Sequence, residues 1–339
     1  MNYKNFDDKY FLWPVRHRIC PQKILSIFNA STERIETSFK KLYPSFETVF
    51  FPSGRSGLSS IMQILNIKRS DPVWCPSFSS RCVIDAISCY GNPTTSHKGI
   101  KLAIIIHQWG FPLISVQEKI DSLAIIEDSN DSLVIDESSL FPNDGRFEVF
   151  SCPKIFGTLM GGFVVCKYKD DAKLLRKMRD ESNYIRGVIQ FSLKMLHNYF
   201  QDEKSSSTFY DYYAGAEAMN GRVLSIITAR LLEIMGQIER IITERKKILE
   251  DVLQISNDYY MYHEMNSNRL PSNLPFKIKN HMNIHKTLDQ LKKIGFVTGT
   301  RYINIAEPFI PKWVNSIPIP VNHFVDINKL KLAVELITT

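Results

Sequence analysis

Lys154 is the residue of this 339-residue chain whose setting most suggests chemistry, because it is the one lysine of the largely apolar stretch FEVFSCPKIFGTLMGGFVVC. A buried amine is costly unless it is paired or neutral. Burial lowers the pKa of a lysine, and the neutral amine can then attack a carbonyl and form a Schiff base. A second interpretation stays open, in which Lys154 lies in a surface loop that follows a strand.

Two acidic residues end another apolar run, IIEDSND, at Glu127 and Asp128. The carboxyl ends of parallel strands face the ligand crevice of an α/β sheet, so Asp128 is a candidate functional acid. Asp128 or Ser129 could instead cap a helix that follows. His107 ends the run AIIIH and is better explained as a core residue than as a metal ligand, because no second histidine stands at ligand spacing. We predict no metal site.

A possible phosphate-binding turn lies between a short apolar run and an apolar helical pattern, in the stretch FPSGRSGL. It places Gly54, Arg55 and Ser56 where backbone N–H groups at a helix N-terminus can bind an anion. The guanidinium of Arg55 also suits phosphate. The alternative is an ordinary strand–helix turn.

The order of these features is the order that pyridoxal 5′-phosphate (PLP) chemistry needs. The turn would hold the phosphate, the acid would keep the pyridine nitrogen protonated, and the lysine would hold the aldehyde and move a proton at the substrate carbon. The combination of turn, acid and lysine therefore indicates a PLP site more specifically than any one of them alone.

The surrounding pattern predicts an α/β fold with a mainly parallel sheet, because short apolar runs alternate with helical segments. A helical pattern covers residues 31–47, and one long amphipathic helix, or two, covers 222–254. Short strands mix with helices from about residue 257 onward. We predict a large domain over 1–240 and a small C-terminal α/β domain over 241–339.

Charge and cysteine usage exclude several classes of protein. The net charge of +7, from 42 basic and 35 acidic residues, is mild, and no basic block with interleaved aromatics indicates nucleic acid. No apolar run is long enough to predict a membrane span. The six cysteines form no C-x-x-C pair and mostly lie in apolar runs, which favours free thiols in a reducing compartment. We expect a cytoplasmic protein without nucleic-acid or membrane partners.

The chain resembles the DegT-type sugar aminotransferases, which are PLP enzymes of the aspartate-aminotransferase-like superfamily, over roughly residues 45–335. FPSGRSGL is similar to the phosphate turn of that family, and IIEDSNDSL to its acidic strand end. FSCPKIFGTLMGG resembles its lysine segment with the following glycine pair. VWCPSFSSRCVIDAI, IIIHQWGFP and AMNGRVLSIITARLLEIMGQIERIITERKKILEDVL match further segments in the same order.

The resemblance implies a three-layer large domain with a mainly parallel mixed sheet and a smaller C-terminal α/β domain. It implies that Lys154 forms the Schiff base with PLP, that Asp128 contacts the pyridine nitrogen, and that residues 54–56 hold the phosphate. Asn220 would reach the phosphate in the neighbouring subunit, which implies a homodimer with shared active sites. The implied reaction transfers an amino group from glutamate to a keto sugar nucleotide, in cell-surface polysaccharide or secondary-metabolite biosynthesis.

Three positions depart from the family pattern. The family usually stacks an aromatic residue on the cofactor at the position of Ser80, although Phe78 is close in sequence. It usually has histidine or glutamine, bonded to the phenolic oxygen of the cofactor, at the position of Asp131. It usually has a phosphate-binding serine five residues before the lysine, where this chain has Val149; Ser151 would serve after a local shift.

Substrate contacts in this family come from variable loops, and here Arg301 and Tyr302 are the candidates. Two alternatives to amino transfer remain. A PLP-dependent sugar dehydratase is one, although such relatives usually have histidine in place of the lysine. A non-catalytic or repurposed protein with the same fold is the other, and it is motivated by the three departures.

Overall fold

A seven-stranded sheet forms the centre of the computed structural model, which describes residues 9–12, 30–96, 98–113, 124–199, 223–260, 268–306 and 310–338. The strand order is β2–β9–β8–β6–β5–β3–β4. Within this sheet β9 pairs antiparallel with β2 and β8, and the other pairs are parallel, which confirms the predicted mixed and mainly parallel sheet. The strands are β2 (Glu47–Phe51), β3 (Pro72–Trp74), β4 (Asn92–Thr94), β5 (Leu102–Ile106), β6 (Ala124–Asp128), β8 (Phe147–Ser151) and β9 (Gly162–Cys166).

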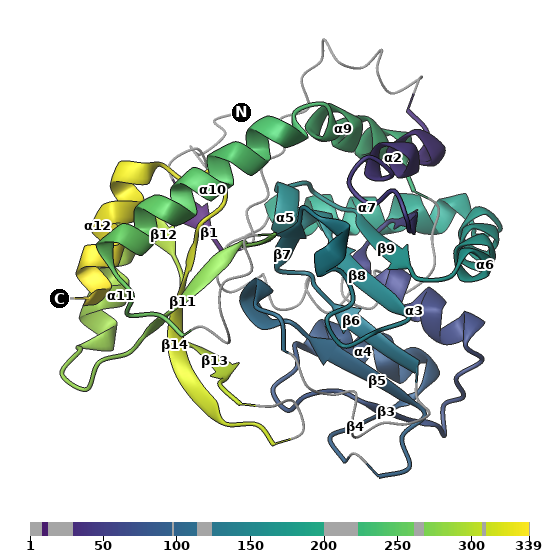
Figure 1. The fold of residues 1–339 in the computed structure, drawn as a ribbon, viewed down its shortest axis with the longest axis horizontal. Helices are drawn as coiled ribbons and strands as arrows, with labels where there is room; N and C mark the ends of the chain where they lie inside the picture. Colours follow the sequence, from purple (N-terminus) through teal and green to yellow (C-terminus); the bar gives the residue numbers. More distant parts are fainter. Residues whose placement is uncertain are drawn as a thin grey trace.

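Helices cover both faces of this sheet and make three layers (Figure 1). One face packs against α3 (Gly54–Ile64), α4 (Arg81–Tyr90) and α6 (Lys169–Asp180). The other packs against α2 (Thr32–Phe39) and α9 (Ser225–Met235). Because both faces are covered, the strands are continuous apolar runs, and all five residues of β9 are buried.

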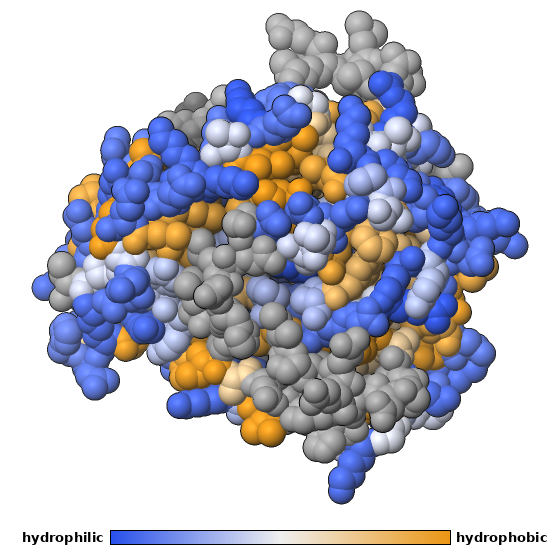
Figure 2. Space-filling model, in the orientation of Figure 1, coloured by the Kyte–Doolittle hydropathy of each residue, from blue (hydrophilic) through white to orange (hydrophobic). Residues whose placement is uncertain are grey.

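A second, three-stranded antiparallel sheet lies in the C-terminal part of the chain, in the order β11–β14–β13. Helix α12 of this part packs against both α10 and α11. Figure 2 shows hydrophilic residues along the outward side of α10, with hydrophobic residues beside them. Two short pairs, β7–β10 and β1–β12, join distant segments of the chain. The elements are β1 (Tyr10–Phe11), β7 (Ser132–Val134), α7 (Tyr184–Tyr199), α10 (Ile238–Ile255), β10 (Arg269–Pro271), β11 (Asn273–Lys277), α11 (Ile284–Lys293), β12 (Phe296–Val297), β13 (Arg301–Asn304), β14 (Trp313–Pro320) and α12 (Ile327–Thr338).

The helices differ from the predicted ones in one place, and over 222–254 the second of the two predicted alternatives is found. The helix expected over 31–47 ends at Phe39, because Pro44 disfavours helical backbone in the residue before it and the chain turns into β2. The pattern over 222–254 forms two helices, α9 and α10. The predicted domain division at 240/241 falls inside α10 and stays a prediction. No helix in the described parts of the chain is long and apolar enough to cross a membrane.

Candidate active site

The candidate residues gather at one edge of the large sheet. Strands β2, β3, β5, β6 and β8 run in the same direction, so their carboxyl ends meet at that edge. The turn at Gly54 follows β2, the loop with Phe78 and Ser80 follows β3, and the loop with Asp131 follows β6. Lys154 follows β8, in the short helix α5 (Cys152–Phe156), and not in the surface loop that the sequence left open.

Lys154 forms an ion pair with Asp131, with 3.2 Å between Nζ and Oδ1, and its side chain is 24% exposed. Burial disfavours the ammonium, but Asp131, Cys82 and Asp128 together outweigh this effect and raise the pKa of Lys154. The expectation that burial would leave this amine neutral is therefore wrong for the protein without cofactor. The charge is tolerated because a carboxylate from the next strand end faces it.

Asp128 is buried at the end of β6, with 5% of its surface exposed. Burial raises its pKa to about 6, against the attraction of Lys154 and a hydrogen bond of 3.1 Å from the Asn130 N–H to Oδ1. The chain continues from Asp128 into β7, so the alternative of a helix cap at this position is wrong. A buried acid that exchanges a proton near neutral pH can pair with a protonated ring nitrogen.

The turn at the start of α3 is built by close backbone approach. Ser53 caps the helix by accepting a hydrogen bond from the Ser56 N–H at 3.0 Å. A Cβ atom at Gly162 would lie 2.2 Å from the Gly54 nitrogen, and one at Gly54 would lie 3.0 Å from Asn130 Oδ1. The glycines thus let the turn sit against both the lysine segment and the loop that follows Asp128.

Ser151 and Val149, the two candidate positions for the phosphate-binding serine, have different surroundings in the structure. Val149 is 2% exposed in the middle of β8, opposite Val164, with its side chain in the core between sheet and helices. Ser151 ends the same strand, and its side chain does not cap α5. Ser151 is thus the half-buried serine at the carboxyl end of β8, at the edge where the other candidate residues gather.

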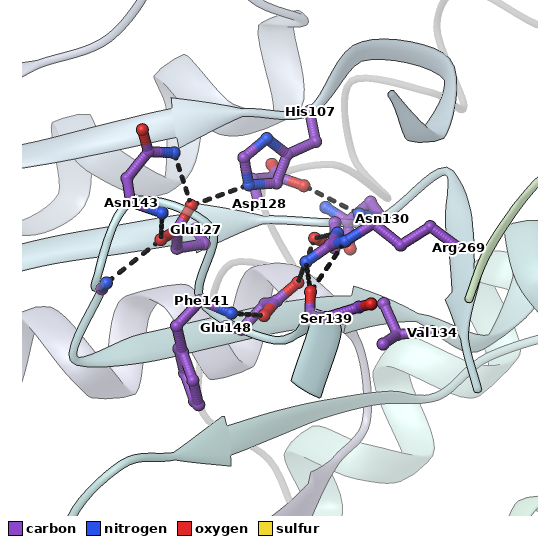
Figure 3. Close-up of polar contacts among 12 residues, drawn as sticks. His107, Glu127, Asp128, Asn130, Val134, Ser139, Phe141, Asn143, Glu148 and Arg269 are labelled. Carbon is purple, nitrogen blue, oxygen red and sulfur yellow. Dashed lines mark hydrogen bonds and ion pairs between the residues drawn. The ribbon is translucent and has the colours of Figure 1, made fainter. Parts of the chain in front are cut away.

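A buried hydrogen-bond network lies beneath the site (Figure 3). His107 Nε2 lies 2.8 Å from Glu127 Oε2, and His107 Nδ1 accepts a hydrogen bond from the Leu113 N–H. Glu127 is fully buried; burial disfavours its charge, but the bonds from His107 and Asn143 lower its pKa overall. His107 is thus a core residue, as expected, and the pair fixes the ends of β5 and β6.

Two buried arginines belong to the frame of the site and were not found from sequence. Arg269 forms an ion pair with Glu148 at 2.8 Å and donates to the Ser129 hydroxyl, next to Asp128 (Figure 3). Arg245 donates to the carbonyl oxygens of Ile155, Leu270 and Pro271, which ties α10 to the lysine helix. Arg245 shares the buried face of α10 with Ile241, Ile248 and Val252, and this spacing was a usable signal in the sequence.

Of the remaining candidates, Ser80 is exposed at the cap of α4, 2.8 Å from the Cys82 sulfur. Phe78 stacks on Tyr302, with 4.8 Å between ring centroids, and thus contacts β13 of the second sheet. Arg301 is exposed on the same strand. Asn220 lies outside the described residues.

The residues present fit PLP. A buried acid and a lysine occupy neighbouring strand ends, and the Gly54 turn is a cradle that a Cβ would fill. Asn130 Oδ1, beside this turn, is buried without a hydrogen-bond partner in the described parts of the chain, so the carboxamide can turn toward an anion. No group of His, Cys, Asp and Glu in the described residues could hold a metal ion.

Solved structures share this fold. One is a "Putative sugar aminotransferase" of Streptococcus pneumoniae in its PMP form (TM-score 0.61, 13% identity, 95% of each chain covered). Another is DesI with its TDP-sugar product (TM-score 0.64, 13% identity, 97% of this chain and 92% of that chain). A third is an E. coli GDP-4-keto-6-deoxy-D-mannose-3-dehydratase with hydrated PLP (TM-score 0.63, 14% identity, 96% and 99% covered).

A comparison with curated protein sequences finds no match. A family model described as "Putative PLP-dependent aminotransferase" matches residues 35–298, which is most of the chain. The turn, the acid and the lysine all fall within this match. The chain therefore belongs to this family of PLP-dependent aminotransferases, and its large sheet has the aspartate-aminotransferase-like architecture of the solved structures.

Proposed function

We propose that the protein transfers an amino group from glutamate to the keto group of a nucleotide-linked sugar. The observation that carries the proposal is the placement of Lys154 and Asp128 on neighbouring strand ends, with Asp131 paired to the lysine amine. The similar fold of DesI, solved with a TDP-sugar product, supports a sugar nucleotide as substrate. Biosynthesis of cell-surface polysaccharide or of a secondary metabolite would use such a product.

Each residue has a proposed role at a stated group. Bound PLP would supply an electron sink for the carbon from which a proton is removed. Lys154 would hold the cofactor aldehyde through Nζ and then carry the proton. The Asp128 carboxylate would pair with the pyridine nitrogen.

The phosphate contacts would come from the 54–56 turn, from Asn130 and from the Ser151 hydroxyl. Ser80 and Asp131 complete the proposed set of cofactor neighbours within the described chain, whereas the Phe78 ring, predicted as a cofactor neighbour, stacks on Tyr302 instead. Asn220 is proposed to reach the second site of a homodimer.

Amino transfer is favoured over sugar dehydration by Lys154 itself. A lysine at this position can both bind the cofactor and return the proton, whereas dehydratases that resemble this chain usually have histidine there. One of the structures with this fold is a dehydratase, so the fold alone does not separate the two reactions. Lys154 is the feature of this chain that supports amino transfer.

Product analysis tests this proposal. Purified protein, PLP, glutamate and a panel of 3- and 4-keto sugar nucleotides should yield an amino sugar and 2-oxoglutarate in equal amounts. Lys154→Ala, with the same fold by circular dichroism, should yield neither. A dehydrated sugar without net amino transfer would contradict the aminotransferase proposal and support a dehydratase. Failure of glutamate to convert bound PLP to PMP would favour a non-catalytic protein.

A homodimer in the cytoplasm completes the proposal. The outer side of α7 exposes large apolar side chains, and a contiguous patch of this kind is typical of an interaction surface. Free thiols are typical of a reducing compartment, and the described cysteines Cys75, Cys82, Cys89, Cys152 and Cys166 are free. The exposed apolar residues are Tyr184, Ile185, Val188 and Ile189, with Leu174 on α6.

A further inference from the structure

Three aromatic side chains from distant parts of the chain meet in one cluster. The rings of Phe78 and Tyr302 are nearly parallel, at 26°, with their centroids 4.8 Å apart. Trp313 meets Phe78 edge-on, at 71° and 5.1 Å. We call Phe78, Tyr302 and Trp313 the aromatic platform.

The two stacked rings are exposed to solvent. Phe78 is 63% exposed and Tyr302 is 49% exposed, although large apolar side chains are normally covered. Phe78 also has a φ of +57°, in the left-handed region that bulky residues rarely adopt. Such backbone conformations persist where the surrounding structure imposes them, and they cluster at ligand sites. Displaying this ring therefore has costs in both solvation and backbone conformation.

Polar groups that can form hydrogen bonds flank the aromatic platform. The Trp313 Nε1–H is buried and has no partner in the described parts of the chain. Asn315 is exposed and pairs directly across the strands with Tyr302, so its side chain is on the same face of the sheet. A carboxamide offers both a donor and an acceptor, which matches the mixed edge of a nucleobase.

Both halves of the aromatic platform are fixed to the catalytic edge of the large sheet. Phe78 lies in the loop after β3, at the carboxyl-end edge of the large sheet, and this loop leads through Ser80 into α4. On the other side, the Asn304 N–H at the end of β13 donates to Gln108 Oε1 at 2.9 Å, just after β5. The cluster thus lies at the rim of the proposed site.

We propose that the aromatic platform binds the nucleobase of the nucleotide-linked substrate, with the base stacked on its exposed face and Asn315 at the edge of the base. This inference rests on the proposed function, because it assumes a nucleotide-linked sugar. Stacking on aromatic rings accepts any base, and hydrogen bonds at the edge supply the preference. Arg301 neighbours Tyr302 but points to the opposite face of β13, where Nη1 bonds the Thr300 carbonyl. The two predicted substrate residues therefore separate, and Tyr302 belongs to the base site.

Direct binding of nucleotides tests the inference without any turnover. Titration calorimetry on the full-length protein would use UDP, TDP and GDP, with inorganic pyrophosphate as the probe that lacks a base. At least one nucleoside diphosphate should bind more tightly than pyrophosphate. Phe78→Ala and Tyr302→Ala should each weaken that nucleotide by about tenfold to a hundredfold, and leave pyrophosphate unchanged.

Three further variants sharpen the test. Asn315→Ala should change the ratio of affinities among the three bases more than it changes pyrophosphate binding. Tyr168→Ala removes another half-exposed aromatic ring, 54% exposed, and should leave every affinity unchanged. Tryptophan fluorescence should be quenched by the bound nucleotide in the parent protein, and less so in Trp313→Phe.

Three results would overturn the inference: no binding of any nucleoside diphosphate, equal binding of pyrophosphate, or unchanged affinity in both Phe78→Ala and Tyr302→Ala. Because Phe78 and Tyr302 are exposed and lie on different elements, failure of one variant to fold leaves the other to decide. The amino-transfer proposal is judged separately, by reaction of Lys154 with PLP. Nucleotide binding without that reaction would contradict the proposed amino transfer and would still support the proposed base site.

Discussion

At the scale of single residues, the site depends on how one amine and two carboxylates share charge. Lys154 and Asp128 could be found from the sequence, because each ends an apolar run. The partner of Lys154 could not, because Asp131 is 23 residues away (154 minus 131) and only the parallel pairing of β6 with β8 brings the two loops together. Asp131 stands where the family usually has histidine or glutamine, and in the structure it faces the lysine.

Asp131→Asn should make the Lys154 amine more reactive in the cofactor-free protein. Removing the carboxylate removes an attraction that raises the pKa of Lys154, so more neutral amine is present at a given alkaline pH. Peptide mapping after reductive methylation across a pH series would show labelling of Lys154 at lower pH. Asp144→Asn, which removes the partner of Lys167, is the control and should leave the Lys154 profile unchanged. An identical profile in Asp131→Asn would show that the ion pair is not formed in solution.

Asp128→Asn should stabilise the cofactor-free protein at neutral pH. The pKa of Asp128 is about 6 in the folded state and 3.8 ordinarily, so the folded protein binds the proton more tightly. The contribution of Asp128 to stability is full below about pH 4 and is lost as the pH rises through about 6, by about 3 kcal/mol. Urea unfolding should show a gain of that order for the variant at pH 7 and almost none at pH 4.

Glu127→Gln provides the contrast of opposite sign. The pKa of Glu127 is lowered, so its contribution is present at neutral pH and is lost as the pH falls. This variant should be less stable than the parent at pH 7, with the difference shrinking under acid. A gain at pH 7 in Glu127→Gln, or a loss in Asp128→Asn, would contradict the charges assigned here.

At the scale of elements, the glycine pair is explained by packing of the chain against itself. The pair is Gly161 and Gly162, and β9 begins at Gly162. The sequence could not predict that Gly162 lies under the first turn of α3, because that contact joins segments about a hundred residues apart. The same limit hid Arg245 and Arg269, whose partners lie on other elements.

Gly162→Ala should displace the start of α3 and weaken the proposed phosphate turn. A Cβ atom there would lie 2.2 Å from the Gly54 nitrogen, so backbone must move. We expect a loss of about 1–3 kcal/mol in the free energy of unfolding and weaker PLP binding by equilibrium dialysis. Gly236→Ala, whose nearest neighbours are at 3.4 Å with ordinary helical φ, is the matched control; it should not lower the free energy of unfolding and should leave PLP binding unchanged. Equal behaviour of the two variants would contradict the tight packing at Gly162.

At the scale of the whole molecule, the fold could be predicted from alternating strands and helices, and the second sheet less well. Apolar runs such as those of β5 and β9 predicted buried strands, because both faces of the large sheet are covered. The oligomeric state could not be predicted in the same way, because a single chain shows an exposed surface but not the subunit that covers it. The apolar side of α7 is the surface that we assign to the second subunit.

Ile185→Glu should convert the proposed dimer into a monomer. Ile185 is 63% exposed on α7, and a carboxylate there would be costly to bury between two subunits. Light scattering coupled to gel filtration would measure the mass. Leu332→Glu, at a 50% exposed position on α12, is the control and should leave the dimer intact. A parent protein that is already monomeric would contradict the proposed homodimer with shared active sites.

The central claim, that Lys154 holds PLP, is tested most directly by borohydride reduction of the protein incubated with PLP, followed by peptide mapping. The account predicts an absorption band between about 400 and 430 nm before reduction and the reduced cofactor on the peptide that contains Lys154. The band and the label should both be absent in Lys154→Ala. A label spread over other lysines, or no uptake of PLP by the folded parent protein, would contradict the account.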